Sequence, residues 1–193
     1  MKPGDLKGEA VNLEESFFAE ENARLLEKMR AKTEKAERRE MLRQVVRIQD
    51  EAFLDRLITM GIGPETAMAL RLIPLVFVAW ADGEMDDRER EAILSAAREQ
   101  GMAAEEMARE VLKNWLDHRP DPKLLGLWKD YVSHLWERFT SDEQLRMRQN
   151  LLTAAEDVAS SAGGFLGISK ISVAEREVIE DLRKVVGGDQ PGA

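Results

Sequence analysis

The pattern of apolar and polar positions along the chain predicts helices throughout and no sheet. Apolar residues recur at helical spacing in most segments, and no stretch alternates with the period of two that marks a half-buried strand. Glycine and proline divide the chain into segments of helical length. We therefore expect an all-α fold, a helical bundle of about eight helices that includes a long N-terminal helix.

The most apolar run, residues 70–80, identifies the centre of this bundle. It lies within a helix that we expect over residues 64–81, and it is apolar on almost every side. A helix without a polar face belongs in the interior of a bundle. Pro74 should kink this helix, because proline has no N–H to donate and its ring crowds the preceding turn.

Further helices should surround this central segment. Asp50 is the expected N-cap of one helix, Ser141 with Gln144 should form a capping box at the start of another, and Met107 is expected on a buried face. The expected helices are 50–60, 87–99, 104–117, 122–139, 141–161 and a last one from Ser172 to just before Gly187.

The long N-terminal helix is expected over residues 13–48, which contain no glycine or proline. Residues 30–40, in its middle, carry no large apolar side chain and should be exposed on all sides. The apolar patch that precedes them therefore either packs on its own domain or belongs to an arm that binds a partner or a second copy of the chain. This patch consists of Phe17, Phe18, Leu25, Leu26 and Met29.

The chain divides into four parts on this basis. Residues 1–12 are expected to be disordered, residues 13–60 to form a helical arm, residues 61–188 to form the globular helical domain, and residues 189–193 to be a loose tail.

Composition narrows the classes of function. The net charge is −9, and residues 61–193 carry 24 acidic against 16 basic side chains, which disfavours nucleic acid and favours cations or basic surfaces as partners. The absence of cysteine excludes disulfides and thiolate metal sites. No apolar segment resembles a signal peptide or is long enough to span a bilayer, so we expect a soluble cytoplasmic protein.

Two segments of the chain align without gaps and predict an internal repeat. Residues 85–93 and 171–179 both begin with an apolar residue, followed by a helix-capping residue and, three positions later, by glutamate. The caps would be Asp86 with Glu89 and Ser172 with Glu175, each forming a capping box. We therefore expect two pseudo-repeated helix–turn–helix hairpins in the bundle.

The first of these turns also resembles a known family. An apolar helix followed by Ala81-Asp82-Gly83, an apolar residue and an acidic stretch ending at Glu89 is typical of the TerB-like tellurite-resistance domain, and residues 170–175 resemble its second turn. The resemblance covers residues 64–186. It implies an all-α bundle without established enzymatic activity, divalent-metal binding at the acidic turn, and association with bacterial stress-response or membrane-linked complexes.

The acidic turn is the candidate metal site, with Asp82, Asp86 and Glu89 as candidate ligands. Hard oxygen ligands suit Mg²⁺, Ca²⁺ or Mn²⁺. Val78 and Trp80 occupy the first and third positions of the corresponding EF-hand loop, which excludes a standard calcium loop.

The position of Asp82 favours a functional role, because a carboxylate at the end of a helix opposes the helix dipole. The corresponding position of the second hairpin is Ile168, so the turn does not require an acid there. The alternative is an Asx turn in which Gly83 supplies a positive φ angle, while Asp86 and Glu89 only cap the next helix.

These features favour a non-enzymatic TerB-like protein-interaction module, with the Phe17–Met29 patch as its docking element and a divalent cation as modulator. One alternative is a metal-dependent enzyme of the hydrolase type that uses the acidic cluster. Against it stand the lack of a second acidic cluster, of paired histidines and of a basic clamp for substrate. The other alternative is a structural protein that self-assembles through its N-terminal helix.

Overall fold

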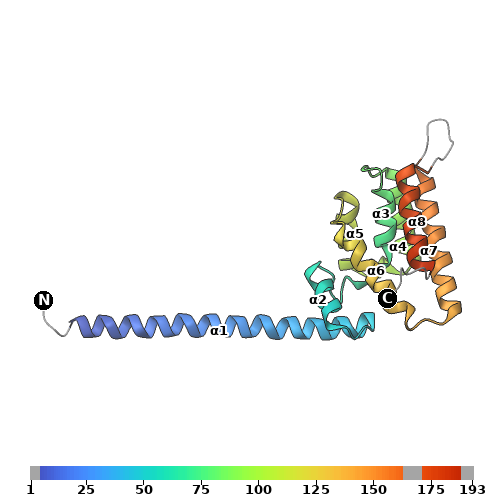
Figure 1. The fold of residues 1–193 in the computed structure, drawn as a ribbon. Coiled ribbons are helices and arrows are strands. Elements are labelled where there is room, and N and C mark those ends of the chain that lie inside the picture. Colours follow the sequence, from blue (N-terminus) through green and yellow to red (C-terminus); the bar gives the residue numbers. More distant parts are fainter. Residues whose placement is uncertain (1–4, 163–170, 188–193) are drawn as a thin grey trace.

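The computed structural model of the protein describes residues 5–162 and 171–187, and their side chains from residue 20 onward except at residue 103. These residues form eight α-helices and two 3-10 helices (η1 and η2) with no strand, which confirms the all-α fold class (Figure 1). The helices are α1 (Asp5–Val46), α2 (Glu51–Thr59), η1 (Ala67–Leu72), α3 (Ile73–Ala79), α4 (Asp87–Glu99), η2 (Met102–Ala104), α5 (Glu106–Asp117), α6 (Lys123–Trp136), α7 (Ser141–Ser161) and α8 (Val173–Gly187).

Helix α3 occupies the centre of the bundle, as the apolar run predicted. Every residue of α3 is buried, and η1, α4, α6, α7 and α8 all pack against it (Figure 1). A segment without a polar face is stable only when neighbours cover all of its sides. The short α3 therefore fixes where the longer, amphipathic helices of the domain must lie.

Residues 64–81 do not form the single kinked helix that we expected. A 3-10 helix, η1, ends at Leu72, and the α-helix begins at Ile73 with Pro74 in its first turn. The first N–H groups of a helix have no intrahelical acceptor, so proline costs least there. Pro74 thus starts a helix instead of bending one.

Helix α1 begins at Asp5, inside the segment 1–12 that we expected to be disordered. Gly8 is accommodated within the helix, at a cost of about 1 kcal/mol relative to alanine, because good helix formers surround it. Residues 1–4, 163–170 and 188–193 lie outside the described residues, and the last range includes the expected loose tail 189–193.

The C-terminal end of α1 is built into the domain, while its described N-terminal part extends away from it (Figure 1). Leu42, Val46 and the following Ile48 are buried in the core. Ion pairs join the same end to α2: Arg39 lies 2.7 Å from Asp55, and Lys35 lies 2.9 Å from the same carboxylate. The base of the arm is therefore held by both apolar burial and charge.

Two local expectations differ from the structure. Met107 is 53% exposed, because α5 begins only at Glu106 and buries the face formed by Ala108, Leu112, Trp115 and Leu116. The N-cap of α7 is Thr140, whose capping-box partner is Glu143, and not Ser141 with Gln144. The sequence here contains two overlapping capping-box patterns, and Gln144 instead donates a hydrogen bond to the Trp136 carbonyl at 3.0 Å.

No helix in the described part of the chain combines the length and the apolarity needed to cross a membrane.

The base of α1 offers a test of how the arm is anchored. We expect Leu42→Ala to lower the free energy of unfolding by about 2–5 kcal/mol, because it removes a fully buried side chain. The adjacent Met41→Ala should change it by less than about 0.5 kcal/mol, because Met41 is largely exposed. Urea denaturation followed by circular dichroism measures both values, and equal effects would contradict this anchoring.

Candidate functional site

The turn between α3 and α4 carries the acidic residues singled out in the sequence. An oxygen of Asp82 accepts a hydrogen bond from the backbone N–H of Glu84 at 3.1 Å, and Gly83 has a φ angle of 98°. This is the geometry of an Asx turn, in which the aspartate side chain closes the turn and glycine adopts a left-handed conformation without strain. Asp82 thus has a local structural role.

Asp86 and Glu89 form a capping box at the start of α4, as predicted. The Asp86 carboxylate accepts a hydrogen bond from the Arg88 N–H at 2.7 Å. Glu89 in turn accepts one from the Asp86 N–H at 3.0 Å. Each bond satisfies an N–H group that would otherwise lack a partner at the helix terminus.

The second hairpin makes the corresponding contacts at the start of α8. The Ser172 hydroxyl accepts a hydrogen bond from the Glu175 N–H at 3.1 Å. The Glu175 carboxylate accepts one from the Ser172 N–H at 2.5 Å. Both predicted caps are therefore confirmed at helix starts.

The two capping glutamates differ from ordinary surface caps because they are buried. Glu89 is 4% exposed and Glu175 is 3% exposed, although they lie on helices far apart in the sequence. Their carboxyl groups meet, since Glu89 is hydrogen-bonded to Glu175. The starts of α4 and α8 are thereby joined by a carboxyl–carboxyl contact inside the protein.

This contact changes the protonation of the pair. The pKa of Glu89 is raised to about 8, mainly by burial. The hydrogen bond from the Asp86 N–H lowers it, whereas the contact with Glu175 and the charges of Glu175 and Asp82 raise it. At neutral pH, Glu89 therefore keeps its proton and donates a hydrogen bond to Glu175. Two buried carboxylates in contact would repel each other, and one shared proton removes that repulsion.

The three predicted metal ligands are not gathered into a metal centre. No group of three or more histidine or acidic side chains within the described ranges is close enough to hold an ion. Asp82 and Asp86 each use an oxygen in a local hydrogen bond, and Glu89 points into the core and holds a proton. Cation binding at this turn would require these hydrogen bonds to rearrange, so it stays a prediction.

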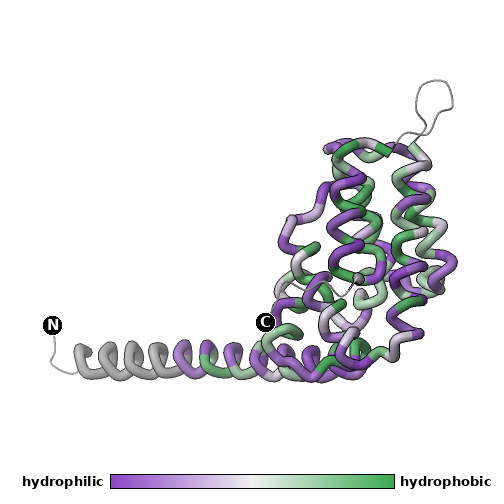
Figure 2. The backbone as a smooth tube through the Cα atoms, turned by 45° about the vertical axis from the view of Figure 1, so that its right-hand side comes forward, coloured by the Kyte–Doolittle hydropathy of each residue, from purple (hydrophilic) through white to green (hydrophobic). Residues whose placement is uncertain are grey.

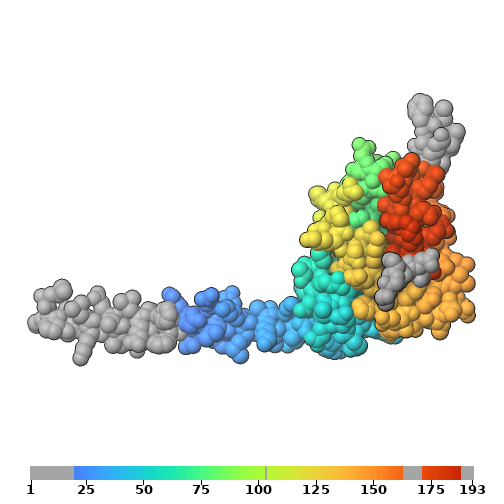
Figure 3. Space-filling view, viewed as in Figure 1, coloured from blue at the N-terminus to red at the C-terminus, as the bar shows by residue number. Residues whose placement is uncertain are grey.

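The predicted docking patch lies on the part of α1 that leaves the domain. Leu25, Leu26 and Met29 are 48%, 56% and 65% exposed, and they form an apolar stretch on a mainly hydrophilic helix (Figure 2). The side chains of Phe17 and Phe18 lie outside the described residues. The space-filling view shows this described stretch of α1 beyond the body of the bundle (Figure 3).

Sequence reasoning did not anticipate that Glu89 and Glu175 meet. The signal was present, because both residues occupy the same position of the two aligned segments. The sequence does not show that α8 and α4 pack against α3, and this packing brings the two helix starts together.

Comparison with protein-family models, with curated proteins and with solved structures finds no match to this chain.

The buried pair predicts that stability falls as pH rises. The unfolded chain loses the Glu89 proton near pH 4.5, whereas the folded protein keeps it to about pH 8. The stabilisation is therefore complete below pH 4.5 and is lost as pH rises through about 8, by about 1.4 kcal/mol for each unit between the two pKa values. Urea unfolding between pH 5 and 9 measures this slope.

The matched variants are Glu89→Gln and Glu143→Gln, which make the same change in a buried and in an exposed capping box. Glu89→Gln should flatten the slope, since glutamine imitates the protonated carboxyl at every pH. Glu143→Gln should leave the slope unchanged, because the hydrogen bonds from Thr140 lower the pKa of Glu143. A slope that survives in Glu89→Gln would refute the shared proton.

The cation prediction has its own test at the same turn. Millimolar Mg²⁺, Ca²⁺ or Mn²⁺ should raise the melting temperature, and more at pH 8.5 than at pH 6.5, because a ligand carboxyl of Glu89 must first lose its proton. Asp82→Asn should abolish the shift. Differential scanning calorimetry that finds no shift with any of the three ions would rule out a cation site here.

Proposed function

We propose that this chain is a non-enzymatic, TerB-like protein-interaction module whose arm, helix α1, is its docking element. The observation that carries the proposal is the apolar stretch Leu25, Leu26 and Met29, which is about half exposed or more on a helix that extends from the bundle and which no other described element covers. The alternatives from the sequence use this surface differently. A self-assembling protein would bind a second copy of the chain through it, and a metal-dependent enzyme would use the acidic cluster instead.

The spacing of the three side chains suits a helical partner. Positions 25, 26 and 29 lie within one turn of each other and on one side of the helix. Burying a large aliphatic side chain contributes about 1.5–3 kcal/mol, so the three together offer several kcal/mol to a complex. A partner helix with an apolar stripe is the simplest surface to cover them.

The anchoring of α1 supports the same proposal. Arg39 pairs with Glu51 at 3.0 Å as well as with Asp55, and Arg43 pairs with Glu51 at 3.1 Å. These contacts hold the exit direction of the arm relative to the domain. A docking helix that is already formed and oriented loses less entropy on binding than a disordered segment does.

The TerB-like part of the proposal rests on the two turns. The residues that carry the resemblance, Asp86 with Glu89 and Ser172 with Glu175, start α4 and α8 in the same way. An internal duplication of one hairpin would account for this similarity. A role in bacterial stress response, and modulation by a divalent cation at Asp82, Asp86 and Glu89, come with this resemblance and belong to the proposal.

The docking role predicts the outcome of paired substitutions on the arm. Leu25→Glu with Met29→Glu should abolish both capture of a protein partner from native cell extract and any self-association, without changing the melting temperature. Ala31→Glu with Arg24→Gln makes the same change in net charge on the opposite side of the helix and should preserve both. Affinity capture and light scattering provide the readouts.

Light scattering separates the two kinds of partner. Loss of dimer mass in Leu25→Glu with Met29→Glu would identify a second copy of the chain, and a constant monomer mass with loss of a captured protein would identify a different partner. The same captured proteins and the same mass in both paired variants would refute a docking role for this surface.

A further inference from the structure

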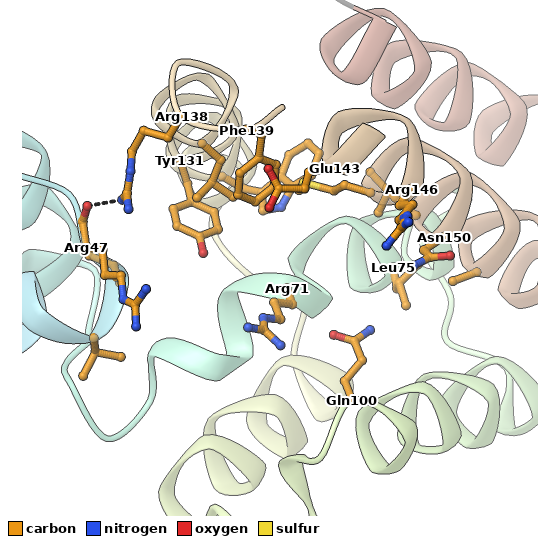
Figure 4. A pocket seen from close by; sticks show the side chains of 17 residues that line it. Arg47, Arg71, Leu75, Gln100, Tyr131, Arg138, Phe139, Glu143, Arg146 and Asn150 are labelled. Carbon is orange, nitrogen blue, oxygen red and sulfur yellow. Dashed lines mark hydrogen bonds between the residues drawn. The ribbon is translucent and has the colours of Figure 1, made fainter. Parts of the chain in front are cut away.

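A cavity of about 750 Å³ is lined by none of the candidate site residues predicted from the sequence. Side chains of α6 and α7 form two of its walls, and η1, α3 and the ends of α1 and α4 complete it (Figure 4). Its volume is within the range of sites that bind small molecules, about 300–1,000 Å³.

Part of the lining is apolar. Trp128 and Leu135 on α6 lie about two turns apart, and Met147 and Leu151 on α7 lie one turn apart, so each helix presents a continuous apolar strip to the cavity. Trp128 is almost fully buried and forms a fixed wall, whereas the other three side chains are partly exposed. This surface suits a hydrocarbon or aromatic group.

The remaining lining is strongly basic, in contrast to the acidic character of the protein. Arg47, Arg71, Arg138 and Arg146 all line the cavity, and they come from four different segments. Glu143 is the single acidic side chain of the lining. Four positive charges against one negative charge make this concavity a local exception in a chain of net charge −9.

These arginines have no carboxylate within ion-pair distance among the described residues. By contrast, Arg39, Arg43, Arg56 and Arg90 elsewhere in the structure each pair with a carboxylate at 3.1 Å or less. Exposed arginines are often simply solvated. Solvation alone does not account for four of them converging, together with apolar walls, on one cavity.

The backbone at Arg47 helps to hold the basic rim. Arg47 is the one described residue other than glycine with a positive φ angle, 56°, a conformation that side chains disfavour. Its carbonyl accepts a hydrogen bond from the Arg138 guanidinium across the cavity rim (Figure 4). This contact restrains the Arg138 guanidinium at the rim before any ligand arrives.

Tyr131 adds a neutral donor at the centre of the basic lining. Its hydroxyl points into the cavity (Figure 4), where the charges of Arg71 and Arg138 act on it. Burial raises the pKa of Tyr131, and the charges of Arg71 and Arg138 only partly oppose this effect. The hydroxyl therefore remains protonated at neutral pH and can donate a hydrogen bond.

We propose that this cavity binds an amphiphilic organic anion, with a carboxylate or phosphate group against Arg47, Arg71, Arg138 and Tyr131 and an apolar chain against Trp128, Leu135 and Met147. The guanidinium fork matches the two oxygens of a carboxylate or phosphate, which makes arginine the preferred residue for such groups. The apolar walls select against a bare inorganic ion. This site is independent of the acidic turn and of the arm surface.

Isothermal titration calorimetry with the full chain tests the proposal. The probes are hexyl phosphate, hexanoate, inorganic phosphate and the uncharged hexyl glucoside. We expect hexyl phosphate or hexanoate to bind at least about tenfold more tightly than hexyl glucoside and inorganic phosphate, because only they satisfy both parts of the lining. Comparison of the two anionic probes identifies the preferred head group.

Variants connect the binding to the cavity. Arg71→Met, which keeps an apolar stem but removes the charge, should weaken binding of the anionic probe at least about tenfold. Tyr131→Phe should weaken it less, since it removes one neutral donor. Arg109→Met makes the same charge change on α5, outside the cavity, and should bind as the wild type does.

Circular dichroism and the melting temperature establish whether each variant folds. If Arg71→Met fails to fold, Arg47→Met makes the equivalent test, because it removes another charge proposed to contact the head group and keeps the carbonyl that accepts from Arg138. Binding of both anionic probes no tighter than hexyl glucoside, or equal binding by the folded cavity variant and Arg109→Met, would overturn the proposal.

Discussion

The structure of this protein depends on the complete burial of α3. Residues 72–79 are all within the core, so no face of this segment is available to water. Five other elements must therefore surround a helix of only two turns. The amphipathic α4, α6, α7 and α8 satisfy this requirement, and their polar faces account for the charged exterior. The arrangement also determines which helix ends become neighbours.

The contact between Glu89 and Glu175 follows from that arrangement. Each glutamate first makes a local contact, because its carboxyl group accepts a hydrogen bond from the N–H of the residue that caps its own helix. Packing α4 and α8 around α3 then converts two local hydrogen-bonding groups into one tertiary contact. Such a pair is tolerated in the interior because one of the two carboxyl groups is protonated. The proton removes the repulsion between two negative charges and forms a hydrogen bond to the other carboxylate.

The fold was largely predictable from the sequence because its signals are local. The start of α4 at Asp87, the caps Asp50 and Asp86, and the burial of the central run all follow from residues within a few positions of each other. The errors arose where local signals were ambiguous. Thr140 and Ser141 both fit a capping box, and Pro74 fits either a kink or a helix start.

The sites were less predictable because they depend on distant residues. The basic cavity combines Arg47, Arg71 and Arg138, which are far apart in the sequence and form no recognisable motif. The sequence indicated no basic clamp, since each arginine alone resembles an ordinary surface residue. Only the folded arrangement of α1, η1 and α6 brings them to one place.

The geometry of α1 has a mechanical consequence. A helix of 42 residues is about 63 Å long, so any rotation about the buried segment near Leu42, as a pivot, would be amplified at its far tip. Because Val46 ends this helix and also lines the cavity, a ligand in the cavity would contact the end of the helix next to this pivot. A turn of about 10° at the pivot would carry the far tip through about 10 Å, given this length. A small rearrangement of the side chains packed around the base of α1 would thus displace the N-terminal tip of the helix by a much larger distance.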